Sequence, residues 1–128
     1  MYEIWTPDAP APGGHYAQGI VHQGVVYVAG QLPIDPQTGH RCVASIEEET
    51  ERALLNVAAI LEAAESGLDQ VLKTTVYIAD ISLWDRVDAV YARIFGDHRP
   101  ARAIVLTNRL HHGCLIEIEA VAATGDRS

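Results

Sequence analysis

One short stretch near the end of the chain encodes two contrasting faces: Leu115-Ile116-Glu117-Ile118-Glu119-Ala120-Val121. Successive side chains of a β-strand point to opposite sides of the sheet, so this alternation predicts a strand. From Ile116 onward, every second residue is apolar and should pack against helices. The other row holds two glutamates between Leu115 and Val121, so both faces of the strand carry apolar side chains.

Two helices are predicted from start signals, apolar spacing and glycine stops. The first begins at Ser45, which forms a capping box with Glu48, and it ends at Gly67. The second begins at Ser82 and ends at Gly96. The apolar positions at helical spacing are Ala53, Leu54, Val57, Leu61 and Ala64 in the first helix and Trp84, Val87, Tyr91 and Ile94 in the second.

The remaining apolar segments predict about six strands in one mixed sheet. Residues 17–21 and 25–29 flank Gln23-Gly24 and should form a hairpin, because glycine allows the positive φ that a tight turn needs. Further strands are expected at residues 71–78, 103–106 and 115–123, after a turn-rich loop at 33–39. The preferred hand of strand–helix–strand crossovers places both helices on one face of the sheet. The expected fold class is α+β, as a single domain over residues 1–128.

The second face of this sheet needs a partner. The run Val25-Val26-Tyr27-Val28 is apolar on both sides, as is the strand quoted above, and two helices can cover only one face. A large apolar face is usually buried against another surface. We therefore expect a homo-oligomer whose sheets pack inward.

The composition argues against several classes of function. The chain has 128 residues, a formal net charge of −8 and no basic stripe, which disfavours a nucleic-acid partner. We expect no signal peptide and no membrane-spanning stretch, which favours a cytoplasmic protein without a membrane partner. Cys42 and Cys114 are expected to be reduced, and neither has the CxxC partner typical of a metal or redox site.

Arg102 is the first candidate for a binding residue. It follows Pro100, where the chain turns from a helix end into an apolar strand, so its backbone should be stiff. A fixed guanidinium suits a carboxylate ligand, which it can grip with two parallel hydrogen bonds. A surface salt bridge is the alternative interpretation.

The two glutamates of the quoted strand are further candidates, because they should face away from the helices. Either could pair with an arginine such as Arg52 or Arg109, or one could hold water and shuttle a proton in a crevice. The segment Gly13-Gly14-His15-Tyr16-Ala17-Gln18-Gly19 allows close approach of backbone to a ligand and offers a phenol, which is a weak signal alone.

Five motifs taken together resemble the RidA/YjgF family of enamine/imine deaminases over residues 9–123. They are His15-Tyr16-Ala17-Gln18, Ala29-Gly30-Gln31-Leu32-Pro33, Asp35-Pro36-Gln37-Thr38-Gly39, Pro100-Ala101-Arg102 and Ile116-Glu117-Ile118-Glu119-Ala120. The resemblance implies a chorismate-mutase-like fold of the bacillus type and a homotrimer with an inner β-barrel and clefts between subunits. It also implies hydrolysis of small imines and enamines, such as 2-aminoacrylate and 2-aminocrotonate, to 2-keto acids and ammonium, with no cofactor and no metal.

The resemblance assigns roles residue by residue. Arg102 matches the arginine that binds the substrate carboxylate, and Glu117 matches the glutamate that positions water. Tyr16 matches the tyrosine that lines the cleft, and Gly30 matches the glycine whose backbone faces the ligand. The positions of His15, Ala29 and Ile104 are also expected to contact substrate.

This chain departs from the family pattern at four positions. His15 stands where a proline is common, Ala29 and Ala103 replace hydroxyl-bearing residues, and Ile104 lies where many members carry cysteine. Fewer hydroxyls imply fewer hydrogen bonds at the cleft wall. His15, or one of the two consecutive histidines His111 and His112, could supply a replacement hydrogen-bond donor. A metal site formed by His111 and His112 is disfavoured, because neighbouring loop side chains rarely converge on one ion.

Three functions therefore stay open from the sequence. The first is a cofactor-free deaminase of imines. The second is a trimeric binder or sensor of small carboxylates such as 2-keto acids, without turnover. The third, RNA cleavage or translation inhibition as attached to some relatives, fits the acidic chain least well.

Overall fold

A computed structural model describes residues 1–125, and residues 126–128 of the expected domain lie outside the described residues. The strands are β1 (Tyr2–Ile4), β2 (Gly19–His22), β3 (Val25–Gln31), β4 (Val71–Ile78), β5 (Ala101–Leu106) and β6 (Ile116–Ala123). The α-helices are α1 (Ile46–Ala63) and α2 (Trp84–Phe95), and short 3₁₀ turns lie at η1 (Leu68–Gln70), η2 (Ile81–Leu83) and η3 (His111–Gly113). No helix among residues 1–125 combines the length and apolarity needed to cross a bilayer.

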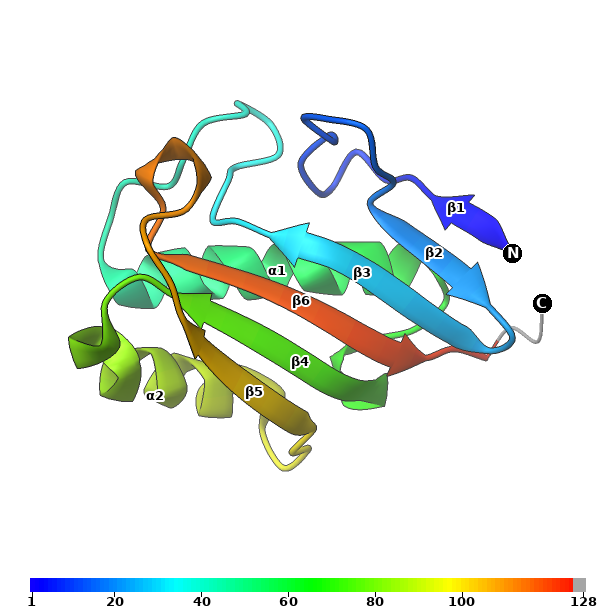
Figure 1. Ribbon diagram of the computed structural model, residues 1–128. Helices are drawn as coiled ribbons and strands as arrows, with labels where there is room; N and C mark the ends of the chain where they lie inside the picture. The colour runs from blue at the N-terminus through cyan, green and yellow to red at the C-terminus, as the bar shows by residue number, and fades with distance from the viewer. Residues whose placement is uncertain (126–128) are drawn as a thin grey trace.

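All six strands form one mixed sheet in the order β1-β2-β3-β6-β4-β5. Neighbouring strands are antiparallel except β4 and β5, which are parallel because α2 carries the chain back between them. Both helices lie on the same side of the sheet, behind it in Figure 1. The expectation of an α+β fold with two helices on one face is confirmed.

Strand β6 lies between β3 and β4 and follows the predicted alternation. Ile116, Ile118 and every second residue after them are buried, whereas the residues between them are half-buried. The opposite face of the sheet carries exposed side chains such as Tyr27 on β3 and Val105 on β5. One chain leaves this second face uncovered by helices, and the expected oligomer stays a prediction.

The core is a single cluster between the helices and the sheet. The four expected positions within α1 are fully buried, as is Ala64 at its C-terminal cap. On α2, Val87 and Tyr91 are buried as expected, whereas Trp84 and Ile94 are only partly buried. Val90 and Phe95 are buried as well, so the apolar stripe of α2 is wider than its spacing predicts.

Turns and helix ends depart from the prediction at two places. The hairpin turn is as expected, with Gly24 at φ 77°, and α2 ends at Gly96 with φ 65°. Gly67 does not end α1: the left-handed residue is Glu65 at φ 59°, which closes the helix two residues earlier. Ser82 does not begin α2 either. It lies in the preceding 3₁₀ turn, where its amide donates to Asp80.

One strand starts earlier than predicted, and another was not predicted. Strand β5 begins at Ala101 and therefore includes Arg102 within the sheet. Strand β1 was not placed at all, although it pairs with β2 from Tyr2 onward. A strand of only three residues offers too little alternation to be recognised.

Two buried amide side chains fasten loops to this framework. The Gln18 amide accepts from the Thr6 amide at 2.7 Å and donates to the carbonyls of Thr6, Ala9 and Pro10. The Asn56 amide, on α1, donates to the carbonyls of Leu32 and Ile34 at 3.0 and 2.9 Å. These bonds satisfy backbone groups that would otherwise be costly to bury.

Replacing Asn56 by alanine should lower the free energy of unfolding by about 2 kcal/mol, because two carbonyls lose their donor. Urea denaturation measures the change. Asn108→Ala, at an exposed loop position, is the matched control and should shift stability by less than about 0.5 kcal/mol. Equal losses in both variants would contradict the role given to Asn56.

Candidate functional site

A depression of about 870 Å³ opens at the end of the sheet where β3 finishes and β6 begins. Its walls come from the N-terminal loop, the end of β3, the loop that follows it, the η3 turn and β6. The lining side chains that bear on chemistry are Tyr16, Ala29, Gly30, His111, His112 and Glu117. Four predicted site residues, those at positions 16, 29, 30 and 117, therefore meet in one pocket.

Glu117 is the carboxylate of this pocket. It projects from β6 on the side away from the helices, as the alternation predicts. Burial raises the pKa of its carboxyl group, and the negative charge of Glu119 adds to the effect, while His111 opposes it. A carboxyl with a raised pKa exchanges protons more readily near neutral pH than an ordinary surface glutamate does.

Gly30 leaves the space that the Glu117 carboxylate occupies. A Cβ atom at position 30 would lie 2.7 Å from Oε2 of Glu117, closer than any real contact. The missing side chain therefore lets β3 and the carboxylate lie against each other. A glycine at this position is needed for close approach, whatever its backbone φ.

Tyr16 lies at the rim of the pocket. Its hydroxyl accepts a hydrogen bond from the Gly13 amide at 3.2 Å, and about half of its surface is exposed. The bond turns the loop back on itself and fixes the ring at the pocket entrance. His15, its neighbour in the chain, does not line the pocket.

The two histidines of η3, His111 and His112, also line the pocket. Their ring centres are 5.5 Å apart, and His112 has a left-handed backbone at φ 60°. Imidazoles here could donate or accept a proton beside Glu117. Within residues 1–125 no group of three or more metal-ligating side chains comes together.

Arg102 and Ile104 lie outside this pocket. The neighbours of Arg102 are on α2: its Nη1 donates to Asp88 at 2.8 Å, and its guanidinium carbon lies 4.7 Å from the ring centres of both Trp84 and Tyr91. In register, Arg102 pairs with Thr74, which lies on the helix side of the sheet. A single chain therefore separates the predicted carboxylate-binding cation from the predicted water-positioning glutamate.

Neither glutamate pairs with the arginines that the sequence suggested. Arg52 donates to Asn56, and Arg109 donates to the Gly113 carbonyl. Glu119 instead accepts a 2.6 Å hydrogen bond from the Tyr77 hydroxyl, which raises the pKa of that phenol. The expected arginine pairing is wrong within the described chain, because the two strands beside β6 supply other neighbours.

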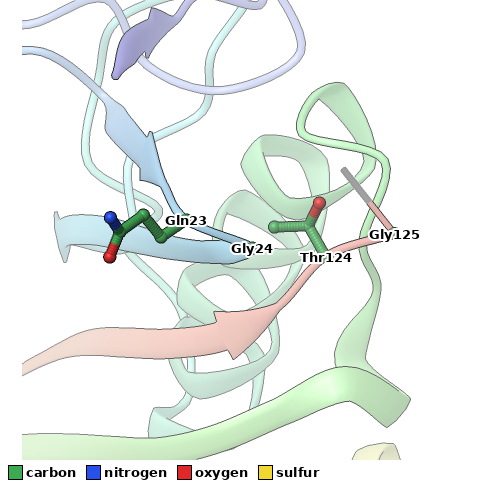
Figure 2. Close-up of a pocket in the computed structure, with 4 residues that line it drawn as sticks. All are labelled: Gln23, Gly24, Thr124 and Gly125. Atoms are coloured by element: carbon green, nitrogen blue, oxygen red, sulfur yellow. The ribbon is translucent and has the colours of Figure 1, made fainter. Parts of the chain in front are cut away.

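A second depression of about 500 Å³ lies far along the sheet, and Figure 2 shows the four residues that line it. Gln23 and Gly24 form the turn between β2 and β3, and Thr124 and Gly125 follow β6. None of these side chains titrates near neutral pH, so the depression offers no acid–base chemistry.

Comparison with known proteins matches residues 6–124 to the family described as Endoribonuclease L-PSP. The chain belongs to the RidA/YjgF family. It is 44% identical to a RutC family protein of Pyrococcus horikoshii over 93% of this chain and 94% of that one. It is 38% identical to the human 2-iminobutanoate/2-iminopropanoate deaminase, covering 95% and 89% of the two chains. The crystal structure of the E. coli YjgF gene product matches with a TM-score of 0.92, at 36% identity and over 96% and 98% of the chains.

Three residues that surround Arg102 in this RidA/YjgF chain were not predicted from the sequence as site residues. Trp84, Asp88 and Tyr91 are spaced four and three residues apart, so they share one face of α2. That spacing is visible in the sequence. Their meeting with Arg102 depends on how α2 packs against β4 and β5, which local pattern does not reveal.

The carboxyl group of Glu117 should titrate above the ordinary value of 4.5, as followed by ¹³C NMR of its side chain. Folding then favours the protonated form, so this group makes the free energy of unfolding fall as pH rises from 4.5 through its folded-state pKa. Glu119→Gln should bring the midpoint down, because a repelling charge is removed. A Glu117 midpoint at or below 4.5 would contradict the burial given to this group.

Gly30→Ala should displace the Glu117 carboxylate while costing about 1 kcal/mol of stability, because the clashing atoms end a flexible side chain. The NMR shift of the Glu117 carboxyl carbon and urea denaturation separate these two effects. Gly13→Ala is the control, since Gly13 lines the same pocket but no atom lies within 4 Å of an added Cβ. An unchanged Glu117 signal in Gly30→Ala would refute the close approach.

Proposed function

We propose that this protein hydrolyses small 2-imino acids, and the enamines that tautomerise to them, to 2-keto acids and ammonium. In this reaction a water molecule adds to the imine carbon, the C–N bond breaks, and the nitrogen leaves with the protons it needs. Activated imines hydrolyse slowly unaided, so placement of substrate and water suffices as the source of catalysis, and no cofactor is required. The human relative's name, 2-iminobutanoate/2-iminopropanoate deaminase, supports the substrate class.

The observation that carries this proposal is the half-buried Glu117 carboxyl with its raised pKa, set against Gly30 in the pocket. As the carboxylate, Glu117 orients water and accepts its proton during attack. As the acid, it returns a proton to the departing nitrogen. A raised pKa helps the return of the proton, because burial disfavours the charged form of Glu117; the carboxylate that remains serves as the base.

Arg102 is proposed to bind the substrate carboxylate. Since it lies outside the pocket of its own chain, a complete cleft needs the Arg102 of a neighbouring copy beside the Glu117 pocket of this one. The uncovered second face of the sheet supports such an assembly. We propose a homotrimer of the chorismate-mutase-like kind, with the sheets forming an inner barrel.

The other predicted contacts fit around this arrangement. Tyr16 would cover the substrate from the pocket rim, and the backbone at Ala29 and Gly30 would face it. Ile104 shares the side of β5 that carries Arg102, so both would reach the same cleft. His15 directly precedes Tyr16 in the loop at the pocket rim and would approach the substrate from there. Residues 1–128 would act as one RidA-like domain in the cytoplasm, removing reactive imines released by other enzymes.

The direct test is clearance of 2-aminoacrylate generated in situ, with semicarbazide trapping the imine that the protein fails to consume. Glu117→Gln should lower kcat about 100-fold, because the group that moves the proton is lost. Arg102→Ala should lower kcat/KM by a similar factor, because the carboxylate loses a charged partner.

The chain offers a matched control for each variant. Glu62→Gln removes an exposed carboxylate from α1, and Arg99→Ala removes an exposed arginine three residues before Arg102. Both should keep at least about a third of wild-type kcat/KM. Equal clearance by wild type, Glu117→Gln and Arg102→Ala would refute the proposed activity.

A second candidate is a binder of small carboxylates without turnover. Ala29 favours it, because a methyl group lines the pocket where the family resemblance implies a hydroxyl, which leaves fewer donors for catalysis. A Lactococcus lactis relative at 41% identity is named as a regulator. Tight binding of 2-ketobutyrate with no clearance of any imine would favour this function over hydrolysis.

A further inference from the structure

We propose that Asp88 occupies the Arg102 guanidinium in the free protein and thereby sets how tightly a ligand carboxylate binds there. This inference rests on the proposed function, because it takes Arg102 to be the carboxylate-binding cation. It adds a residue that the family resemblance did not assign. In this view the internal carboxylate and the ligand carboxylate share one guanidinium.

The contact between the two side chains is direct but partial. Oδ1 of Asp88 lies 2.8 Å from Nη1 of Arg102, and the two side chains are 46% and 28% exposed. This hydrogen bond engages one nitrogen of a group that has five N–H donors. The guanidinium can therefore accept a second carboxylate without first breaking its bond to Asp88.

Two aromatic rings, in addition to Asp88, hold the guanidinium in place. Its central carbon lies 4.7 Å from the ring centres of Trp84 and Tyr91, a distance at which both rings attract a cation. The Tyr91 ring is in turn fixed by a buried 2.7 Å hydrogen bond between its hydroxyl and Thr74. Removing the charge of Asp88 while keeping its shape should leave Arg102 where it is.

Asp88 then acts chiefly through its charge. A ligand carboxylate on the same guanidinium would lie a few ångströms from the Asp88 carboxylate, and like charges at that range repel appreciably in a partly exposed site. In the free protein the same charge compensates a cation that would otherwise lie unpaired between two rings. Asp88 thus weakens the grip on substrate and product and so assists release of the keto acid.

The experiment measures binding of 2-ketobutyrate to the full-length protein by titration calorimetry. Asp88→Asn keeps an acceptor oxygen and removes the charge, so it should tighten binding about three- to tenfold. The chain has two tryptophans, so a Trp5→Phe background leaves Trp84 as the fluorescent reporter beside Arg102. Its emission should change when 2-ketobutyrate binds, both with Asp88 intact and in the Asp88→Asn variant. In turnover assays Asp88→Asn should lower KM without raising kcat.

Asp85→Asn is the control, because it removes one negative charge from an exposed position of the same helix turn. It should leave the Kd within about twofold of wild type, since Asp85 is exposed to solvent and forms no ion pair with Arg102. Equal tightening by both variants, or no tightening by Asp88→Asn, would overturn the role of Asp88.

Arg102→Ala separates this inference from the proposed function. If it abolishes binding while Asp88→Asn leaves Kd unchanged, Arg102 is the carboxylate site and Asp88 does not tune it. If Arg102→Ala binds 2-ketobutyrate as wild type does, the carboxylate is held elsewhere and the proposed cleft is wrong. Binding that is undetectable in both wild type and Asp88→Asn would overturn the role of Asp88, and the clearance assay then tests hydrolysis separately.

Discussion

The double pairing of β6, with β3 on one side and β4 on the other, is the constraint on which the rest of the structure depends. A central strand cannot slip by one residue without turning its apolar row to the wrong face. The burial of Ile116 and Ile118 under the helices therefore also fixes Glu117 on the opposite side. A catalytic candidate is held in position here by the packing of its neighbours in the chain.

The same sheet places its two charged candidates in different surroundings. Glu117 lies in a recess whose burial disfavours its charge, whereas Arg102 lies at the edge strand β5 among aromatic rings and a carboxylate. The guanidinium keeps its charge at the partly exposed edge of the sheet, and burial in the recess raises the pKa of the carboxyl group. The division suits a site in which one group grips an anion and the other moves protons.

Patterns with a local cause were predictable from the sequence. The alternation of β6, the capped start at Ser45 and the Gln23-Gly24 turn each depend on neighbouring residues, and each is present in the structure. The end of α1 was misplaced because Glu65 adopts a conformation that favours glycine. The pairing of Arg102 with Asp88, and the space that Gly30 leaves for Glu117, depend on which elements lie side by side, so local pattern could not reveal them.

Neutral amides fasten the segments around the pocket: Gln18 holds the N-terminal loop, and Asn56 holds the chain beyond β3. Carboxamides do not ionise in the biological range, and their bonds to backbone carbonyls are hardly affected by dissolved electrolyte. The bonds made by these two amides should thus persist as acidity and ionic strength change. The protonation of Glu117, in contrast, changes with pH. The loop attachments and the charge in the recess therefore depend on different groups.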